Sequence, residues 1–586
     1  MNRTKHIIRS QYTVAFISCF ALLLSSVFPL IIQFKTHDFN GSLFYQTTYD
    51  EIYYASLIQK KTEGFGTPFL WEHRLEEYPK LTTGWNMHPV TLKPLKIIVK
   101  LGIPLNILFI SLHIILPMLL LWALFFLFRL YFDKRNAWIA GITVLASANI
   151  LTANSITTFI IQKFIPTIDL SFFNIAQLSF LPFFRTPFPG FAYVLFIGIL
   201  LIIISAFRQK RIWILLLTIP LLAGLRYSYV SLFNASFVFM HMYGLIYLID
   251  GTLSKSLTIK ERVQCSLILI GTLIFSISIL RSIFTYFDLP YVNSRNLYIT
   301  VSQIIGTLVL LGSFIYHKQK KSLIKFLRSN IEIITLIITP FILLNTQVIT
   351  GKSWQVYNYE IYISWLMISI GIVLLFRKYI TKKSNVFLVV AVLILILEGE
   401  WNGLSWQKNV SELSYLKKPL EQLTTDESKV ILSSGNSDGE TLSQFKGIFP
   451  YNTSVAFFDI PTEKITRELQ DRTANTICAI SSGKISYTEI ARQTPILHIF
   501  LGLDEAYPYI NNHKVTNRSQ IIEDLGNKFE QTCLNFKRND IRYRIDYILL
   551  RSNETVHPSL REHTRIKMKL PTPIDTYTLY EVFSNK

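Results

Sequence analysis

The sequence predicts an α-helical polytopic membrane protein with a C-terminal α/β domain. Half of the 586 residues are hydrophobic, 14% are aromatic, and the mean hydropathy is +0.35. The apolar residues form blocks of roughly 17–25 residues, the length at which a helix crosses a bilayer. After residue 400 these blocks end, and helix-like stretches alternate with short β-like runs, namely KVILSS, SVAFFDI, TICAIS, ILHIFL, YRIDYILLR and TYTLYEVF. We therefore expect a transmembrane part over 1–400 and an extracytoplasmic α/β domain over 401–586.

About eleven apolar blocks are expected to span the membrane. They cover 13–33, 104–128, 137–156, 189–207, 212–228, 231–249, 264–284, 297–316, 330–349, 359–376 and 384–400. The first block is long and no small-residue cleavage site follows it cleanly, so we interpret it as a span rather than a signal peptide. The same layout leaves a long first outside loop over 34–103.

The net charge of +20 comes mostly from basic clusters in alternate connections between these blocks. The positive-inside rule explains such a distribution and argues against a nucleic-acid partner. It predicts a multi-pass protein of the plasma or inner membrane with a cytoplasmic N-terminus. An odd number of spans then places the C-terminal domain outside the cytoplasm.

Four cysteines divide between the two parts. Cys19 and Cys265 fall in apolar blocks and are expected to be inert packing residues. Cys478 and Cys533 fall in the C-terminal domain, where an extracytoplasmic location would allow a disulfide. The sequence does not establish the distance between them, so the pairing stays open.

Two adjacent acids follow the first block within the stretch TTYDEIYYASLIQ. If this stretch is helical, Asp50 and Tyr54 lie on one face, whereas Glu51 points elsewhere. A plain interpretation is that both acids begin a surface helix, where acids are favoured. The alternative is that a carboxylate at the membrane surface takes a proton in a reaction.

The residues Asp50, Glu51, Tyr54 and Ala55 match a D-E-x-x-Y-A-like pattern. Together with the layout of spans and loops, this pattern resembles the GT-C superfamily of membrane glycosyltransferases. That superfamily includes protein O-mannosyltransferases and the aminoarabinose transferases that modify lipid A. The resemblance implies inverting transfer of a sugar from a polyprenyl-phosphate donor to a glycan, lipid or protein acceptor of a bacterial cell envelope. Asp50 would be the general base, and Glu51 would support it or position the acceptor.

A donor phosphate needs basic partners near the outer interface. Lys93 lies in the first outside loop, Arg185 in the stretch FFRTPFPG, Arg226 at the outer end of the fifth block, and Lys352 just beyond the ninth. For each one the alternative is a basic side chain that reaches the lipid headgroups.

Polar residues are also dense in the stretch 345–365, between two apolar blocks. Gln347, Asn358 and Glu360 join Lys352 there, and we assign all four to substrate binding, together with Tyr54. Polar groups at membrane depth are costly unless they face a cavity or a partner. The alternative is a polar reverse turn.

No metal or other cofactor is expected. The second outside segment offers Asp169 but no D-x-D motif, and the chain has no Cys/His ligand spacing. Two further functions remain open: a transporter or flippase of lipid-linked glycans, and a non-catalytic envelope assembly protein. A transporter would require charged residues buried within the spans.

Overall fold

The computed structural model describes most of the chain. The described residues are 2–36, 54, 58, 89–152, 163, 181–185, 189–286, 300–346, 348, 359–407, 415–424, 429–434, 442, 448–451, 463–481, 486–491, 518–541, 544–572 and 575–583.

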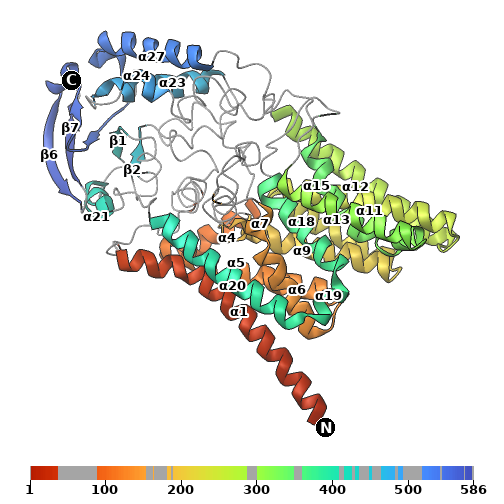
Figure 1. The fold of residues 1–586 in the computed structure, drawn as a ribbon. Helices are drawn as coiled ribbons and strands as arrows, with labels where there is room; N and C mark the ends of the chain where they lie inside the picture. The colour runs from red at the N-terminus through yellow and green to blue at the C-terminus, as the bar shows by residue number, and fades with distance from the viewer. Residues whose placement is uncertain are drawn as a thin grey trace.

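The N-terminal part of the chain forms a helical bundle (Figure 1). Its helices are α1 (Asn2–Thr36), α4 (Pro89–Lys100), α5 (Leu105–Phe128), α6 (Lys134–Ala146), α7 (Ala148–Leu151), α9 (Gly190–Arg208), α10 (Thr218–Arg226), α11 (Val230–Leu253), α12 (Ile259–Tyr286), α13 (Val301–Gln319), α14 (Leu323–Ser329), α15 (Ile331–Leu344), α18 (Trp365–Leu375), α19 (Arg377–Lys382) and α20 (Ser384–Gln407). The 3-10 turns η2 (Pro182–Phe184) and η3 (Ile212–Leu217) and the π-helical turn η4 (Glu360–Ser364) lie between them.

Five helices among the described residues are long and apolar enough to cross a membrane, namely α1, α5, α9, α11 and α20. The pair α14 and α15 is bent by 77° and makes a sixth if it crosses as one span. All eleven ranges expected to span overlap a described helix, but eleven crossings are not confirmed. One reason is that the ranges 212–228 and 359–376 each form a shorter apolar helix.

The first and last of these long helices pack side by side. A Cβ added to Gly399 of α20 would lie 2.6 Å from the Cα of Ser25 in α1, so only glycine allows this approach. Figure 1 shows that α1 and α20 run in the same direction. If both cross the membrane, an odd number of crossings must separate them. Eleven crossings meet this condition, and so do the five long helices alone.

Three helices end in the same backbone turn. Lys210, Lys255 and Lys321 follow α9, α11 and α13 and have φ of 55°, 55° and 52°. Each occupies the left-handed position of a Schellman turn, in which the next residue donates back to the helix, as Arg211 N does to Ala206 O at 2.9 Å. The three turns therefore share one backbone device, and all three lie in basic connections that we expect to be cytoplasmic.

The C-terminal part forms a mixed sheet, as the alternating pattern predicts. Its strands are β1 (Lys429–Ser433), β2 (Ile448–Pro450), β4 (Tyr547–Leu550), β6 (Thr564–Pro571) and β7 (Thr576–Val582), in the order β2-β1-β4-β7-β6. The pairs of β1 with β2 and with β4 are parallel, whereas β4–β7 and β6–β7 are antiparallel. A second, two-stranded sheet pairs β3 (Ile480–Ser481) with β5 (Thr555–Val556).

Helices cover both faces of the larger sheet. Val430 and Leu432 of β1 enter one core with residues of α23 (Glu463–Ala479) and α27 (Arg518–Leu534), while Ile431 enters the opposite core with α21 (Lys417–Glu421). The remaining short elements are η6 (Gln422–Thr424), α24 (Tyr487–Ala491), η8 (Arg538–Asp540) and α28 (Pro558–Arg561). Alternate residues of β1 thus serve two apolar layers, as expected for a strand buried on both sides.

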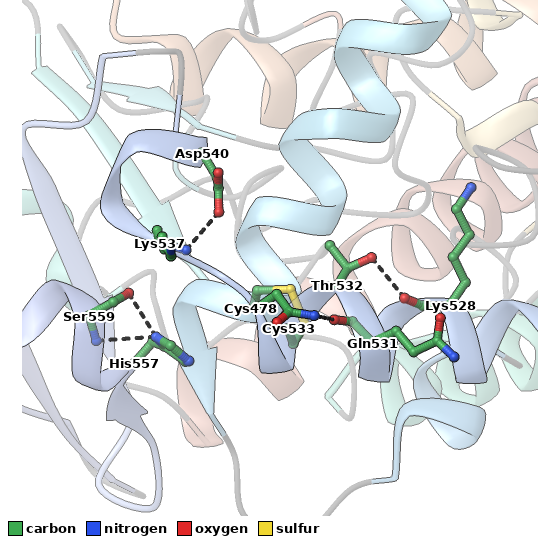
Figure 2. Close-up of a disulfide and its surroundings, with 10 residues drawn as sticks. Cys478, Lys528, Gln531, Thr532, Cys533, Lys537, Asp540, His557 and Ser559 are labelled. Atoms are coloured by element: carbon green, nitrogen blue, oxygen red, sulfur yellow. Dashed lines mark hydrogen bonds between the residues drawn. A yellow bond between two sulfur atoms is a disulfide. The ribbon is translucent and has the colours of Figure 1, made fainter.

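A disulfide joins the ends of α23 and α27 (Figure 2). The Cα atoms of Cys478 and Cys533 are 4.8 Å apart, and both residues are almost fully buried. The backbone N–H of His557 donates to the carbonyl of Ala479 at 2.9 Å, so the β5–α28 corner packs beside the bridge. The pairing that the sequence left open is therefore present.

Candidate functional site

A buried arginine precedes α9. Phe183 and Phe184 of η2 enter the bundle core, and Arg185, the next residue, is only 3% exposed. Its Nη1 donates to the hydroxyl of Tyr362, and its guanidinium carbon lies 5.1 Å from the centre of that ring. Contacts of a cation with a ring and a phenol strengthen where water is excluded, so Tyr362 holds the guanidinium in one orientation.

Other aromatic side chains surround this pair. Tyr229, at the N-cap of α11, meets Tyr362 edge-on with ring centres 5.6 Å apart, and Tyr193 of α9 meets Trp365 at 6.1 Å. Tyr193 and Tyr229 are both close enough to Arg185 to interact with its charge. We call Arg185, Tyr193, Tyr229, Tyr362 and Trp365 the Arg185 cluster.

The π-helical turn η4 and the residue before it contact three different segments of the bundle. Tyr359, just before it, accepts a hydrogen bond from Asn234 Nδ2 of α11 at 2.8 Å. Glu360 accepts from the hydroxyl of Ser302 in α13 at 3.1 Å, and Tyr362 meets Arg185. The wider π turn thus gathers polar side chains at one level of the bundle. Such turns often mark functional sites.

The side chain of Glu360, from η4, lies beside the N-terminus of α13. That helix begins with a capping box in which Thr300 and Gln303 each accept the other's backbone N–H. The N-terminus of a helix favours a nearby carboxylate, and Glu360, 6% exposed, occupies such a position. The carboxylate is therefore buried with hydrogen-bond donors rather than in a purely apolar core.

Tyr54 belongs to the segment between α1 and α4 and lies in the core of the helical bundle. Its side chain is 6% exposed and is part of the same buried cluster as Tyr229 and Tyr362. Asp50 and Glu51 lie outside the described residues.

Of the other expected site residues, the structure describes two, Lys93 and Arg226. Lys93 is exposed on α4, and nothing places it in the cluster. Arg226 ends α10, three residues before Tyr229, with its guanidinium carbon 5.7 Å from the centre of the Phe233 ring. Gln347, Lys352 and Asn358 lie outside the described residues.

Two buried polar residues were missed by the sequence reasoning. His113 of α5 is fully buried and stacks on Phe184, with ring centres 4.9 Å apart. Glu398 of α20 is 2% exposed, and neither of its carboxylate oxygens has a hydrogen-bond partner among the residues that the structure describes. A polar residue within an apolar block was the available signal for both.

The Arg185 cluster has the chemistry of an anion site. A guanidinium presents several donors in a fixed plane that matches phosphate oxygens, and neighbouring phenols can add further donors. No group of three or more potential metal ligands occurs among the residues that the structure describes. No protein-family model matches the chain, and no curated protein matches it either.

Proposed function

We propose that this protein is an integral-membrane glycosyltransferase. It transfers a sugar from a polyprenyl-phosphate donor to a cell-envelope acceptor on the outer side of the membrane. The donor enters from the bilayer, and its phosphate is held at the Arg185 cluster. The observation that carries the proposal is the convergence of Arg185, Tyr54 and η4, three separate sequence-predicted segments, on one buried site.

The chemistry of such a transfer agrees with these groups. Negative charge develops on the leaving phosphate, and a preorganised guanidinium in a water-poor site stabilises it at little reorganisation cost. The acceptor hydroxyl must lose a proton as it attacks, and we assign that role to Asp50 as general base with Glu51 in support. Attack from the face opposite the phosphate inverts the anomeric carbon.

Orientation and span number belong to the same proposal. We propose about eleven crossings, a cytoplasmic N-terminus and an extracytoplasmic C-terminal domain. The buried Cys478–Cys533 disulfide supports that location, because disulfides form and persist in oxidising compartments.

The decisive test replaces Asp50 by Asn in the full-length protein in proteoliposomes. Labelled polyprenyl-phosphate sugars serve as donors, and transferred label is measured. Loss of a general base lowers the rate by roughly 10²–10⁴-fold. Asp38→Asn, in the same loop, is the matched control and should keep the wild-type rate. Equal transfer by Asp50→Asn and wild type would remove Asp50 from the mechanism.

A transporter of lipid-linked glycans is the second candidate. Glu398 and His113 favour it, because both are buried polar residues inside long apolar helices. Residues of this kind mark substrate or proton pathways in transporters. Movement of a labelled lipid-linked glycan across proteoliposomes without any covalent product would select this candidate over the transferase.

A further inference from the structure

The segments that follow two neighbouring strands of the C-terminal sheet, β1 and β4, pack on opposite faces of that sheet. β1 lies between its parallel partners β2 and β4. After β1 the chain supplies Leu442 to the core on one face, whereas after β4 it supplies Val556 and Leu560 to the core on the other. In open α/β sheets, the place where outgoing connections diverge in this way is where ligands bind, outside the carboxyl ends of the strands.

One carboxylate bridges the two strand ends at this place. Ser434 and Arg551 are the first residues after β1 and β4. The Ser434 hydroxyl donates to Oε1 of Glu554, and the Arg551 backbone N–H donates to Oε2 at 2.8 Å. Because both ends are tied to Glu554, the polar groups there are held in fixed relative positions.

Tyr577 of β7 and Asp575, just before β7, also lie at this edge. The guanidinium carbon of Arg551 lies 5.9 Å from the centre of the Tyr577 ring in the neighbouring strand β7. Asp575, just before β7, accepts from the backbone N–H of Thr576 at 2.7 Å and of Ser552 at 3.4 Å. A hydrogen bond from the Ser552 side chain, helped by the backbone N–H groups of Thr576 and Ser552, keeps the pKa of Asp575 below its usual range.

The balance of charge at this edge indicates the class of ligand. The described residues at the ends of β1 and β4 and the start of β7 supply two carboxylates, Glu554 and Asp575, against one guanidinium, Arg551. A phosphate or carboxylate ligand would meet net repulsion there. Hydroxyl groups, in contrast, can donate to the carboxylates and accept from the guanidinium.

We propose that the carboxyl edge of β1 and β4 binds a hydroxyl-rich carbohydrate chain. Glu554 and Asp575 accept hydrogen bonds from its hydroxyls, and Arg551 donates to its oxygens. The inference rests on the proposed function only in identifying this carbohydrate as the acceptor of the transfer. Binding itself needs no donor and no transfer.

The test is binding of the full-length protein in nanodiscs to an array of defined oligosaccharides. Wild type should bind at least one hydroxyl-rich glycan, and Arg551→Gln and Glu554→Gln should each weaken that binding by roughly 10-fold or more, the cost of a hydrogen bond to a charged group. Ser434→Ala is a milder variant and should weaken it by about threefold. Lys528→Gln and Glu523→Gln, both exposed on α27, are the matched controls and should change it less than about twofold.

Folding is monitored in every variant by the Cys478–Cys533 disulfide, measured as protection from alkylation. Weakened glycan binding with the disulfide intact supports the site. Three outcomes overturn it: no glycan bound by wild type, equal binding by the edge variants, or binding of inorganic phosphate in place of glycans. Loss of transfer in Asp50→Asn with glycan binding unchanged would separate this site from the transferase centre.

Discussion

The two ends of α9 carry the same cation–tyrosine contact in different surroundings. Before its first turn, Arg185 is 3% exposed and lies over Tyr362. At its last residue, the side chain of Arg208 is 41% exposed, with its guanidinium carbon 4.2 Å from the centre of the Tyr131 ring and its Nη1 3.9 Å from Glu332 Oε1. The contact type alone therefore does not distinguish the two arginines; their burial does.

This difference in burial changes how strongly each guanidinium interacts with its surroundings. Water screens the Arg208 charge, and Glu332 neutralises part of it, so the pair ties helix ends together at modest energy. Arg185 is held in an aromatic, water-poor environment, where a charge is costly to bury and interacts strongly with any anion that enters. We therefore propose Arg185, and not Arg208, as the phosphate-binding arginine.

The largest effect should come from replacing Arg185, with the same replacement of Arg208 as the comparison. Arg185→Gln removes the charge that would face the leaving phosphate, and we expect transfer to fall by roughly 10²–10³-fold. Arg208→Gln should change it by less than about fivefold. Both rates are measured in proteoliposomes with labelled donor. Comparable losses of transfer for the two variants would show that the burial of Arg185 does not give it a role that Arg208 lacks.

A smaller effect should follow from the tyrosine hydroxyls. Tyr362→Phe keeps the ring under Arg185 but removes the hydroxyl that accepts from Nη1, which should lower transfer by roughly 10-fold. Tyr131→Phe, at the other end, removes a hydrogen bond of 3.4 Å to Glu332 and should cost less than about threefold. If the two substitutions have equal effects, the hydroxyl of Tyr362 does not position Arg185.

Glu398 extends the comparison to a buried acid that has no hydrogen-bond partner in the described part of the chain. Replacing it by Leu removes two unsatisfied oxygens from the α1–α20 contact region and should stabilise the protein by about 1–3 kcal/mol. Glu360→Leu should do the opposite, since it leaves the Ser302 hydroxyl without its acceptor. Thermal unfolding in detergent measures both. A loss of stability in Glu398→Leu would indicate a partner for this acid outside the described residues.

The smallest effect is expected for the solvent-exposed ion pair between Arg565 and Glu581. Arg565 in β6 is 63% exposed and donates to Glu581 in β7, which lowers the pKa of that carboxyl. A lowered pKa means that the pair stabilises the fold above about pH 4–5 and loses this contribution as the pH falls through the pKa of Glu581. Arg565→Gln should shift the acid-unfolding midpoint of the C-terminal domain upward by a few tenths of a pH unit. An unchanged midpoint would show that the pair contributes nothing.

Some local elements of the C-terminal domain followed from the sequence, and others did not. The apolar runs around Lys429–Ser433, Tyr547–Leu550 and Thr576–Val582 form strands as predicted. The run TICAIS was predicted as a strand, but only its last two residues form one, β3. Its first four residues end α23, which continues through Ala479, with the Thr476 hydroxyl donating to the carbonyl of Arg472 one turn earlier. β6 was missed because its alternating basic side chains are those of an exposed edge strand.

By itself, the sequence determined the apolar helices, the change of architecture after residue 400 and the basic connections, because each depends on residues close together in the chain. It also identified Arg185 and Glu360 as candidates, since polar residues beside apolar blocks are conspicuous, and Tyr54 through the D-E-x-x-Y-A-like pattern. Only the tertiary structure decided that Tyr193, Tyr229 and Tyr362 surround Arg185 and that Cys478 meets Cys533. Aromatic residues in apolar blocks look like ordinary core residues, and contacts between distant segments depend on packing that no local pattern records.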